Sequence, residues 1–564
     1  MTNGPLPASG RLLPSGSGDV PEVHHQAPHT RHWHGDVPLT ATNVTTHSIP
    51  HAGRTSLAGL VRRLLVGGIG LALAACNVGP AYQRPAAPQV QGYSAAQDAT
   101  AIPAASSAPG PAAGAQVLQP GTAVASHWWE GFGSPALDRL VTQALANNHD
   151  LAAAQATLEQ AQFELKAARG AFYPQVAVGL AAQRTQTSGT ANGGTPGARL
   201  YNLYTGQVSV GYNPDVFGLN RAVARGAQAQ VDLARDQLAA ARLTIAGNVM
   251  HAALNLAALA EEVAATRKTL DDQRQILELT RTRYELGAAS EFDLLTQQSQ
   301  LASSEAHLPQ LQQAQDQARH LLATYLGKFP SAADGLEIPA LQALHLPATL
   351  PLSLPSTLVR ARPDIRAAEA QLRAVNAQVG AAVARMYPSL DLRGDFGAGS
   401  AHGGKLFDPA SRVWDLAASL LAPVFEGGTL RAQKQASAAA YRAVFANYQG
   451  TVLAAFREVA DVLRALQHDA VTLDAEARAL QSAQRAFELV RTQYQAGAVD
   501  YLNLLTSETQ FQNARIAFVQ AEAQRYADTA ALYLVLGGGP WEAPGGAGAV
   551  QGEAVTTSGA GSGN

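Results

Sequence analysis

The side chain with the clearest potential for chemistry is the thiol of Cys76, the only cysteine in the chain. Two arginines, Arg62 and Arg63, precede an apolar run, Leu64 to Ala75, that ends in small residues just before this thiol. A basic start, an apolar core and small residues before a cleavage point are the parts of a secretory signal peptide. The run is shorter than the about 18 residues of a membrane-spanning helix. The pattern therefore predicts a signal peptide that ends directly before Cys76.

This segment resembles a bacterial lipobox, which implies that Cys76 receives diacylglycerol, is freed at its amino group by cleavage and is then acylated again. Asn77 follows in place of an aspartate, and by resemblance to bacterial lipoproteins this implies release to the outer membrane. Residues 61–75 are the predicted signal peptide. Residues 1–60, rich in Pro, Gly, Thr and His, are predicted to be a non-native or disordered leader, which a start at Val61, Leu60 or Leu57 would remove. Its histidines could alternatively form a metal-binding tract.

Signatures of catalysis are missing from the remaining sequence. We find no HExxH, no Gly-rich phosphate loop with Lys-Ser/Thr and no strand-GxSxG-helix pattern. A single cysteine excludes a disulfide framework and a Cys-rich metal site. The balance of 40 Lys+Arg against 43 Asp+Glu excludes the basic face of a nucleic-acid-binding protein. We therefore expect no enzyme, no metal and no cofactor apart from the acyl and diacylglycerol groups on Cys76.

A second group of candidate residues lies in two copies of one motif. RTRYELGAASEFDLLTQQSQ (Arg281–Gln300) aligns without gaps to RTQYQAGAVDYLNLLTSETQ (Arg491–Gln510), about 210 residues later. In each copy a glycine is predicted to end one helix in the left-handed conformation, and a Ser or Asp is predicted to cap the next. In the first copy the aspartate three residues after the serine completes a capping box.

Helix capping by itself would explain the residue types in these turns. The functional hypothesis is that the turns form the end of a tube, where acidic side chains ring an aperture and hairpins of a partner dock. The candidate gate or docking residues are Tyr284, Gly287, Ser290, Asp293, Tyr494, Gly497 and Asp500.

The elements that must position these turns follow the same order in both copies: helix, strand pair, very long helix, turn, long helix. One helix is predicted from about Leu137 to Arg169, because Pro174, five residues later, prevents its continuation. No proline occurs between Phe217 and Tyr284, which predicts a rod about 100 Å long. Apolar residues recur every seven positions and predict coiled-coil-like packing, at Val263, Leu270, Leu277 and Tyr284 and again at Leu473, Leu480, Phe487 and Tyr494.

The strand pairs alternate between apolar side chains and polar or small ones. Apolar residues of the first pair include Val176, Val178 and Leu180, and those of the second include Leu390, Leu392 and Phe396. A strand from Pro174 to Gln186 extends about 43 Å, enough to cross a bilayer when tilted. A soluble sheet is the alternative, but we predict no other sheet for the hairpins to pack against, which favours a transmembrane barrel.

Four strands cannot close a barrel, and open edges in lipid leave backbone groups unpaired. Two copies would give eight strands with a filled interior, whereas three would give twelve strands around a water-filled lumen. The small and charged inward residues favour three copies.

The predicted organisation after the signal peptide has five parts. Residues 76–131 form a lipid-anchored Pro/Ala-rich tether, 132–330 the first repeat, 331–355 a Pro-rich joint, 356–540 the second repeat, and 541–564 a disordered Gly-rich tail.

Six motifs in order resemble the TolC-like outer-membrane factor family, NodT lipoprotein subgroup. They are CNVGPAYQRPAAP, WWEGFGSPALDRL, LVRARPDIRAAEAQLRAV, ARMYPSLDL, PVFEGGTLRA and the paired YxxG turns. The resemblance implies a mainly α fold with transmembrane β-strands, in which a homotrimer forms a twelve-stranded β-barrel continued by a periplasmic α-helical barrel. It also implies a lipid-anchored outer-membrane exit channel that passively conducts substrates from a resistance-nodulation-division transporter and a periplasmic adaptor. The alternative is an outer-membrane conduit for type I secretion.

Gates in this family use acidic residues just after the two turns. Asp293 matches such a position in the first turn, whereas Asn503 and Thr506 stand where relatives have acidic residues in the second. Asp500 and Tyr494 remain candidates there. The sequence does not identify the cargo, the pump or the adaptor.

Overall fold

The computed structural model describes residues 78–90, 92–93, 100–187 and 199–539. All described residues belong to one compact unit of the chain. Cys76, the predicted signal peptide, the leader and the Gly-rich tail lie outside the described residues.

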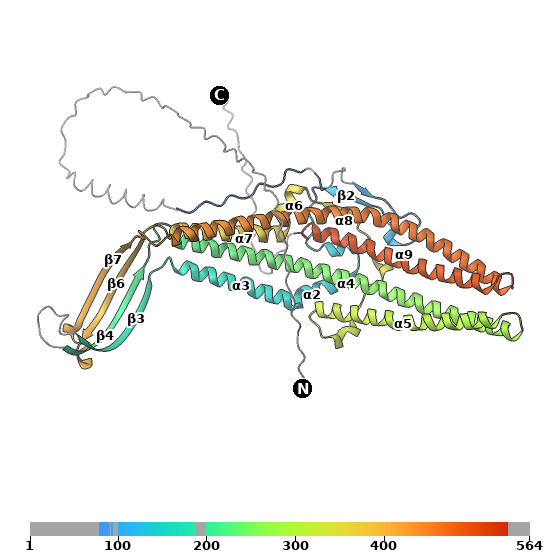
Figure 1. Ribbon diagram of the computed structural model, residues 1–564, viewed down its shortest axis with the longest axis horizontal. Helices are drawn as coiled ribbons and strands as arrows, with labels where there is room; N and C mark the ends of the chain where they lie inside the picture. The colour runs from blue at the N-terminus through green and yellow to red at the C-terminus, as the bar shows by residue number, and fades with distance from the viewer. Residues whose placement is uncertain (1–77, 91, 94–99, 188–198, 540–564) are drawn as a thin grey trace, which may run out of the picture. The chain divides into compact units, whose positions relative to one another are not determined.

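Two successive parts of the chain share one order of elements (Figure 1). The first contains α3 (His149–Gly170), β3 (Gln175–Thr187), β4 (Arg199–Tyr212), α4 (Leu219–Glu285) and α5 (Glu291–Tyr325). The second contains α7 (Pro363–Ala384), β6 (Ser389–Ser400), β7 (Arg412–Leu421), α8 (Thr429–Gln495) and α9 (Tyr501–Val535). Helices α4 and α8 each have 67 residues, and α5 and α9 each have 35. The predicted internal repeat is therefore confirmed.

The region predicted as one helix from Leu137 to Arg169 consists of two helices, α2 (Pro135–Asn147) and α3. Asn148 between them has an extended backbone, and its Oδ1 accepts hydrogen bonds from the amides of Asp150 at 2.9 Å and Leu151 at 3.1 Å. Its Nδ2 donates to the carbonyl of Tyr325 at 3.1 Å. The single-helix prediction is wrong because an asparagine that caps one helix and also binds the end of α5 favours a break.

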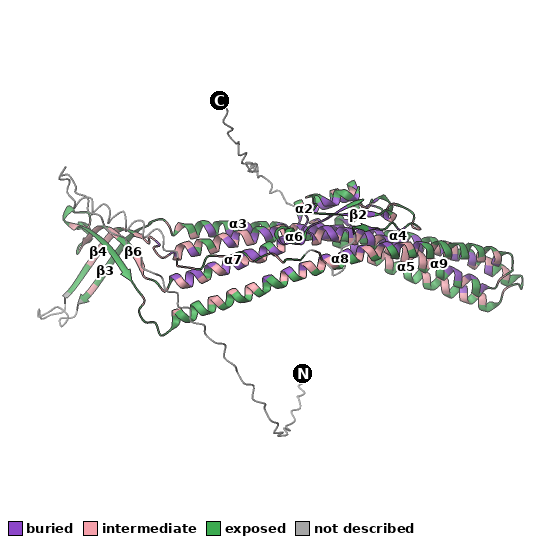
Figure 2. Cartoon of the chain, turned by 90° about the horizontal axis from the view of Figure 1, so that it is seen from above, coloured by how far each residue is buried: buried purple, intermediate pink, exposed green. Residues whose placement is uncertain are grey.

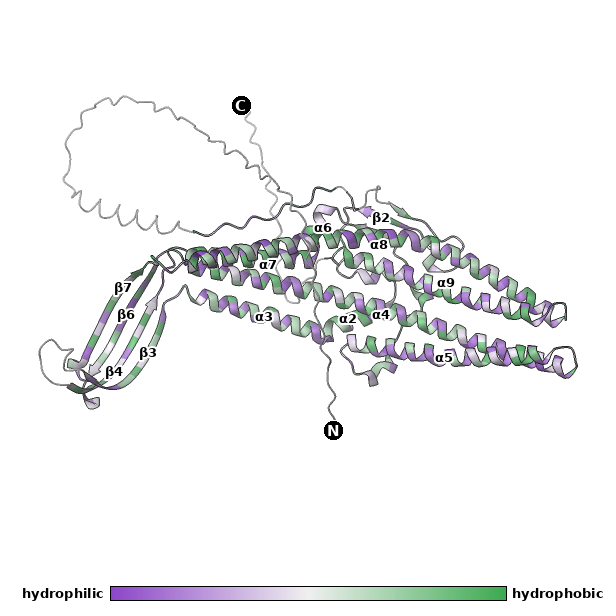
Figure 3. Cartoon of the chain, viewed as in Figure 1, coloured by the Kyte–Doolittle hydropathy of each residue, from purple (hydrophilic) through white to green (hydrophobic). Residues whose placement is uncertain are grey.

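Strands β3, β4, β6 and β7 form a four-stranded sheet in that order, with antiparallel pairing throughout. One row across it joins Val178 to Val208, Val208 to Phe396, and Phe396 to Trp414. Val178 is 77% exposed and Trp414 is 78% exposed. The strands alternate in hydropathy along their length (Figure 3). The predicted alternation is confirmed, and the outer edges of β3 and β7 have no partner strand within the described residues.

A second, three-stranded sheet joins distant parts of the chain. Strand β2 (Gln116–Pro120) pairs with β1 (Ala101–Ile102) and, in parallel, with β5 (Thr349–Leu352). The prediction that the hairpins form the only sheet is wrong. Parts of the segments expected to be a tether and a joint fold against the helices, because their apolar side chains enter the main core, among them Ile102, Trp129, Leu341, Leu350 and Leu352.

Helix α4 is the centre of the helical part, and it contacts α3, α5, α7 and α9. Among the described helices it alone has a window long and apolar enough to cross a membrane, but 67% of that window is buried inside the chain, which is typical of a core helix. Helix α8 packs on α7 and α9, and the part of α8 nearest the sheet is largely exposed (Figure 2). Both the sheet and the helical part therefore leave open sides.

Candidate functional site

The two predicted turns lie at the end of α4 and α8 opposite the four-stranded sheet (Figure 1). Gly287 and Gly497 have φ of 70° and 76°, the left-handed conformation expected of them. Ser290 Oγ accepts a hydrogen bond from the Asp293 amide at 3.1 Å, and Asp293 Oδ2 accepts one from the Ser290 amide at 3.0 Å. Asp500 Oδ1 accepts from the Asn503 amide at 3.0 Å. The capping predictions are confirmed, while a role of these residues in gating or docking stays a prediction.

The two equivalent tyrosines before the turns have different surroundings. Tyr494 is 3% exposed, whereas Tyr284 is 41% exposed. In α8 the residues of the sevenfold pattern are buried up to the end of the helix, at Phe487 and Tyr494. Near the end of α4 the buried residues are instead Gln273, Ile276 and Thr280, which do not belong to the predicted pattern. The reason is that α4 meets α8 and α9 with a different face here, in an apolar cluster built mainly from the second repeat.

Arg283 links the end of α4 to the end of α8. Its Nη1 donates a hydrogen bond to the carbonyl oxygen of Tyr494 at 2.5 Å, and its guanidinium carbon lies 4.7 Å from the centre of the Tyr494 ring. The Tyr494 hydroxyl is 3.1 Å from Thr280 Oγ1. Arg283 was not among the candidate residues predicted from the sequence. The second repeat has Gln493 at the equivalent position. That difference between the copies was the available signal.

Tyr501 links the remaining helices near the turns. Its hydroxyl donates to Gln297 Oε1 of α5, and Gln297 Nε2 donates to the carbonyl of Gln273 in α4 at 3.2 Å. Burial raises the pKa of Tyr501 above its ordinary range, with Glu508 contributing through its charge. The hydroxyl therefore stays neutral and able to donate. Together with Arg283, this chain of bonds joins the four helices that enter and leave the two turns.

Glu508 is an acid buried in this helical end, with 2% of the residue exposed. Its Oε1 accepts a hydrogen bond from Gln512 Nε2 at 3.0 Å, and its Oε2 has no hydrogen-bond partner among the described residues. The pKa of Glu508 is raised to about 7, mainly by burial. Asp272 also raises it, while hydrogen bonds from Gln273 and Gln512 and the charge of Arg491 lower it. A carboxyl group in this position changes protonation close to neutral pH.

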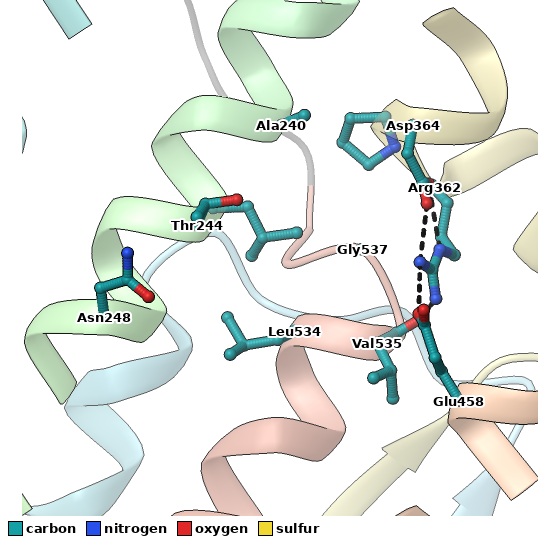
Figure 4. A pocket seen from close by; sticks show the side chains of 11 residues that line it. Ala240, Thr244, Asn248, Arg362, Asp364, Glu458, Leu534, Val535 and Gly537 are labelled. Carbon is teal, nitrogen blue, oxygen red and sulfur yellow. Dashed lines mark hydrogen bonds and ion pairs between the residues drawn. The ribbon is translucent and has the colours of Figure 1, made fainter. Parts of the chain in front are cut away.

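A separate polar cluster surrounds Arg362, which follows α6 (Pro355–Ala361). Its guanidinium donates to Asp364 at 2.7 Å and 3.0 Å, to Glu458 at 2.8 Å and to the carbonyl of Val535 at 2.9 Å (Figure 4). Burial by itself lowers the pKa of Arg362, but the two carboxylates outweigh it and raise the pKa. The adjoining cavity has a volume of about 270 Å³. We interpret Arg362 as a brace between α7, α8 and α9, because its charge is already paired.

Comparison with known proteins gives the identity of this fold. Residues 140–328 and 354–538 each match the model of the outer membrane efflux protein family. The chain belongs to this family. It is 33% identical over 421 residues to the pyoverdine export outer membrane protein OpmQ of Pseudomonas aeruginosa, covering 74% of this chain and 87% of that protein. It is 30% identical over 484 residues to the outer membrane protein OprJ of the same organism, covering 84% of this chain and 95% of OprJ.

A solved structure of the outer-membrane channel OprN superposes with a TM-score of 0.73 at 28% identity. The superposition covers 82% of this chain and 99% of that chain. The resemblance drawn from the sequence motifs is therefore confirmed, and so is the TolC-like fold, which is mainly helical with strands that do not close in one chain. The protein is the outer-membrane channel component of an efflux system.

Proposed function

We propose that three copies of this chain form the exit duct of a tripartite efflux pump. In this proposal twelve strands close a barrel in the outer membrane, and the helices continue it as a tube into the periplasm. A resistance-nodulation-division transporter passes substrates through a periplasmic adaptor that docks at the helical turns, and lipid on Cys76 anchors the assembly. The observation that carries the proposal is the open four-stranded sheet with one exposed apolar face and one polar face.

The two faces of the four-stranded sheet differ in polarity, as expected for a barrel wall with lipid on one side and water on the other. The apolar face carries Val178 and Trp414, which the other described residues leave exposed. On the opposite face, Asp395 accepts hydrogen bonds from Ser209 at 2.5 Å and from Arg393 at 2.7 Å. A hydrocarbon environment suits the first face, whereas the charges of the second need water.

The number of copies follows from the edges and from the charges. Unpaired strand edges in lipid cost several kcal/mol for each unsatisfied backbone group, so edge strands β3 and β7 require partners from other copies. An eight-stranded barrel is filled by its own side chains. Charged groups such as Arg393, Asp395 and Asp415 on one face therefore favour twelve strands around a lumen.

The test of the barrel compares two adjacent residues at the middle of β3. Leu180 lies on the apolar face and is exposed, and Ala181 lies on the other face. Leu180→Arg should cost about 2 to 4 kcal/mol in the bilayer and abolish heat-stable trimers in outer-membrane fractions. Ala181→Arg is the matched control and should retain them. Equal loss in both variants, or a native mass that corresponds to one or two copies, would contradict the proposal.

Efflux is tested by deletion of the gene followed by a susceptibility panel. We expect lowered tolerance to at least one compound, restored by the wild-type chain. Because a tube lined by small and polar side chains has little selectivity, the transporter should determine which compounds respond. Full tolerance of the deletion strain to every compound, with the pump expressed, would refute the efflux role.

Lipidation is tested separately. Cys76→Ser should remove acyl label from the protein.

A further inference from the structure

The residues that directly follow the predicted lipid-attachment site lie along α7. A Cβ atom added to Gly79 would be 2.8 Å from the Cα of Gly380, so the two backbones are in direct contact. The carbonyl oxygen of Pro80 accepts a hydrogen bond from Asn376 Nδ2 at 3.3 Å. We call residues 78–84 the strap. Its contacts move from Gly380 back to Glu369, and the strap therefore runs antiparallel to α7.

Glu369 binds the C-terminal end of the strap. It is 8% exposed, and its Oε2 accepts hydrogen bonds from Arg84 Nε at 3.0 Å and Arg84 Nη2 at 2.6 Å. Its Oε1 accepts one from the Tyr82 hydroxyl at 3.4 Å. A buried carboxylate without a cation is strongly destabilising, so Glu369 favours the docked strap over a free one.

The N-terminal end of the strap lies at the end of α7 that leads to the four-stranded sheet. Gly380 lies four residues before the end of α7 at Ala384, a rise of about 6 Å, and β6 begins at Ser389. Cys76 lies three positions before Gly79, so their Cα atoms are at most about 11 Å apart. Acyl groups on that cysteine are therefore confined to the end of α7 that joins the proposed membrane-spanning strands.

We propose that Glu369 and Gly380 form a clip that positions the lipid anchor against the barrel. Glu369 acts through Arg84 and Tyr82, and it is a positioning residue for the anchor. Gly79 is required because a Cβ atom there would lie 2.8 Å from the Cα of Gly380, too close for any other side chain. This inference rests on the lipidation of Cys76 in the proposed function. Without these contacts the segment after Cys76 could move freely. With the strap docked on α7, the acyl chains are held beside the start of β6.

The clip is tested by chymotrypsin cleavage after Tyr82 in the full-length, detergent-solubilised protein. Glu369→Gln removes the charge that holds Arg84, and Gly79→Val creates a collision with Gly380. Both should raise the cleavage rate about tenfold or more, because each frees the strap. The matched control is Glu337→Gln, which breaks an exposed 2.6 Å ion pair with Arg139 and should leave the rate unchanged. Wild-type cleavage rates in both strap variants would overturn the clip.

A second measurement separates positioning of the anchor from a structural role. Trimer recovered from outer membranes is quantified for Glu369→Gln, Cys76→Ser and the double variant. If the clip acts through the lipid, the double variant loses no more trimer than Cys76→Ser alone. If the double variant loses more trimer than Cys76→Ser alone, the two substitutions act independently, and the positioning role is overturned. Absence of acyl label on wild-type Cys76 would refute the lipidation and with it the positioning role, while the cleavage assay would still report whether the strap is clipped.

Discussion

The buried carboxyl of Glu508 should make the helical end of the protein less stable as the pH rises. Its pKa is raised from 4.5 to about 7, with burial as the main cause. The folded state therefore binds the proton more tightly than the unfolded state. The stability that this proton contributes is complete below pH 4.5 and is lost as the pH rises through about 7. A displacement of this size corresponds to about 3 kcal/mol once Glu508 is ionised.

Glu508→Gln retains the shape and hydrogen-bonding capacity of the side chain but cannot ionise. At pH 8.5 we expect the variant to resist local opening by about 3 kcal/mol more than the wild type. At pH 5, just above the ordinary pKa of 4.5, we expect a difference below about 1 kcal/mol. The groups that face this position are Asp272 and Gln273 from α4, Arg491 from α8, and Gln512 from α9 itself. None of them changes in the variant.

Amide hydrogen exchange of α9 around residue 508 measures this opening directly, after correction for the intrinsic rate at each pH. Protection at pH 8.5 should increase about a hundredfold in the variant. The matched control is Glu488→Gln on α8, where Gln484 donates to an exposed carboxylate at 2.9 Å in the same spacing. Equal protection of wild type and variant at pH 8.5, or the same gain at both pH values, would refute the reasoning.

Two further predictions concern the arginines that join helices. Arg283→Ala removes the bond to the Tyr494 carbonyl, worth about 1.5 to 3 kcal/mol, and should raise the conductance of the purified channel in planar bilayers. Arg281→Ala, which removes only an exposed pair with Glu278, should not, and equal conductance in both variants would exclude Arg283 as a restraint on opening. Arg362→Met leaves two half-exposed carboxylates without their cation and should cost about 1 to 2 kcal/mol, because water solvates part of each charge. The cost is measured as a lower dissociation temperature of the trimer. The exposed Arg360→Met is its control, and the same decrease in both would contradict a bracing role.

Features with a local cause could be predicted from the sequence. The alternation in β3 and β6 depends only on the two-residue period of a strand. Gly287 and Ser290 act within a few residues of themselves, as left-handed C′ glycine and N-cap. The duplication added a second observation of each pattern, which is why the element order of both repeats was predictable.

Features that depend on distant partners could not be predicted in the same way. The strand β2 is short, and its partner β5 lies more than 200 residues later, so no periodic pattern marked either as part of a sheet. The heptad positions do not reveal that Tyr494 is buried while the equivalent Tyr284 is exposed. That difference arises because α4 presents another face to the second repeat.

The sequence by itself determined the two strand pairs of the four-stranded sheet, the long helices, the turns and the family, because each depends on neighbouring residues or on a motif. Only the tertiary structure decided which polar groups meet. Arg84 and Glu369 are 285 positions apart, and Arg283 and Tyr494 are 211 apart. Pairing at such separations is set by the packing of whole helices, and the residues involved carry no local mark of their partner.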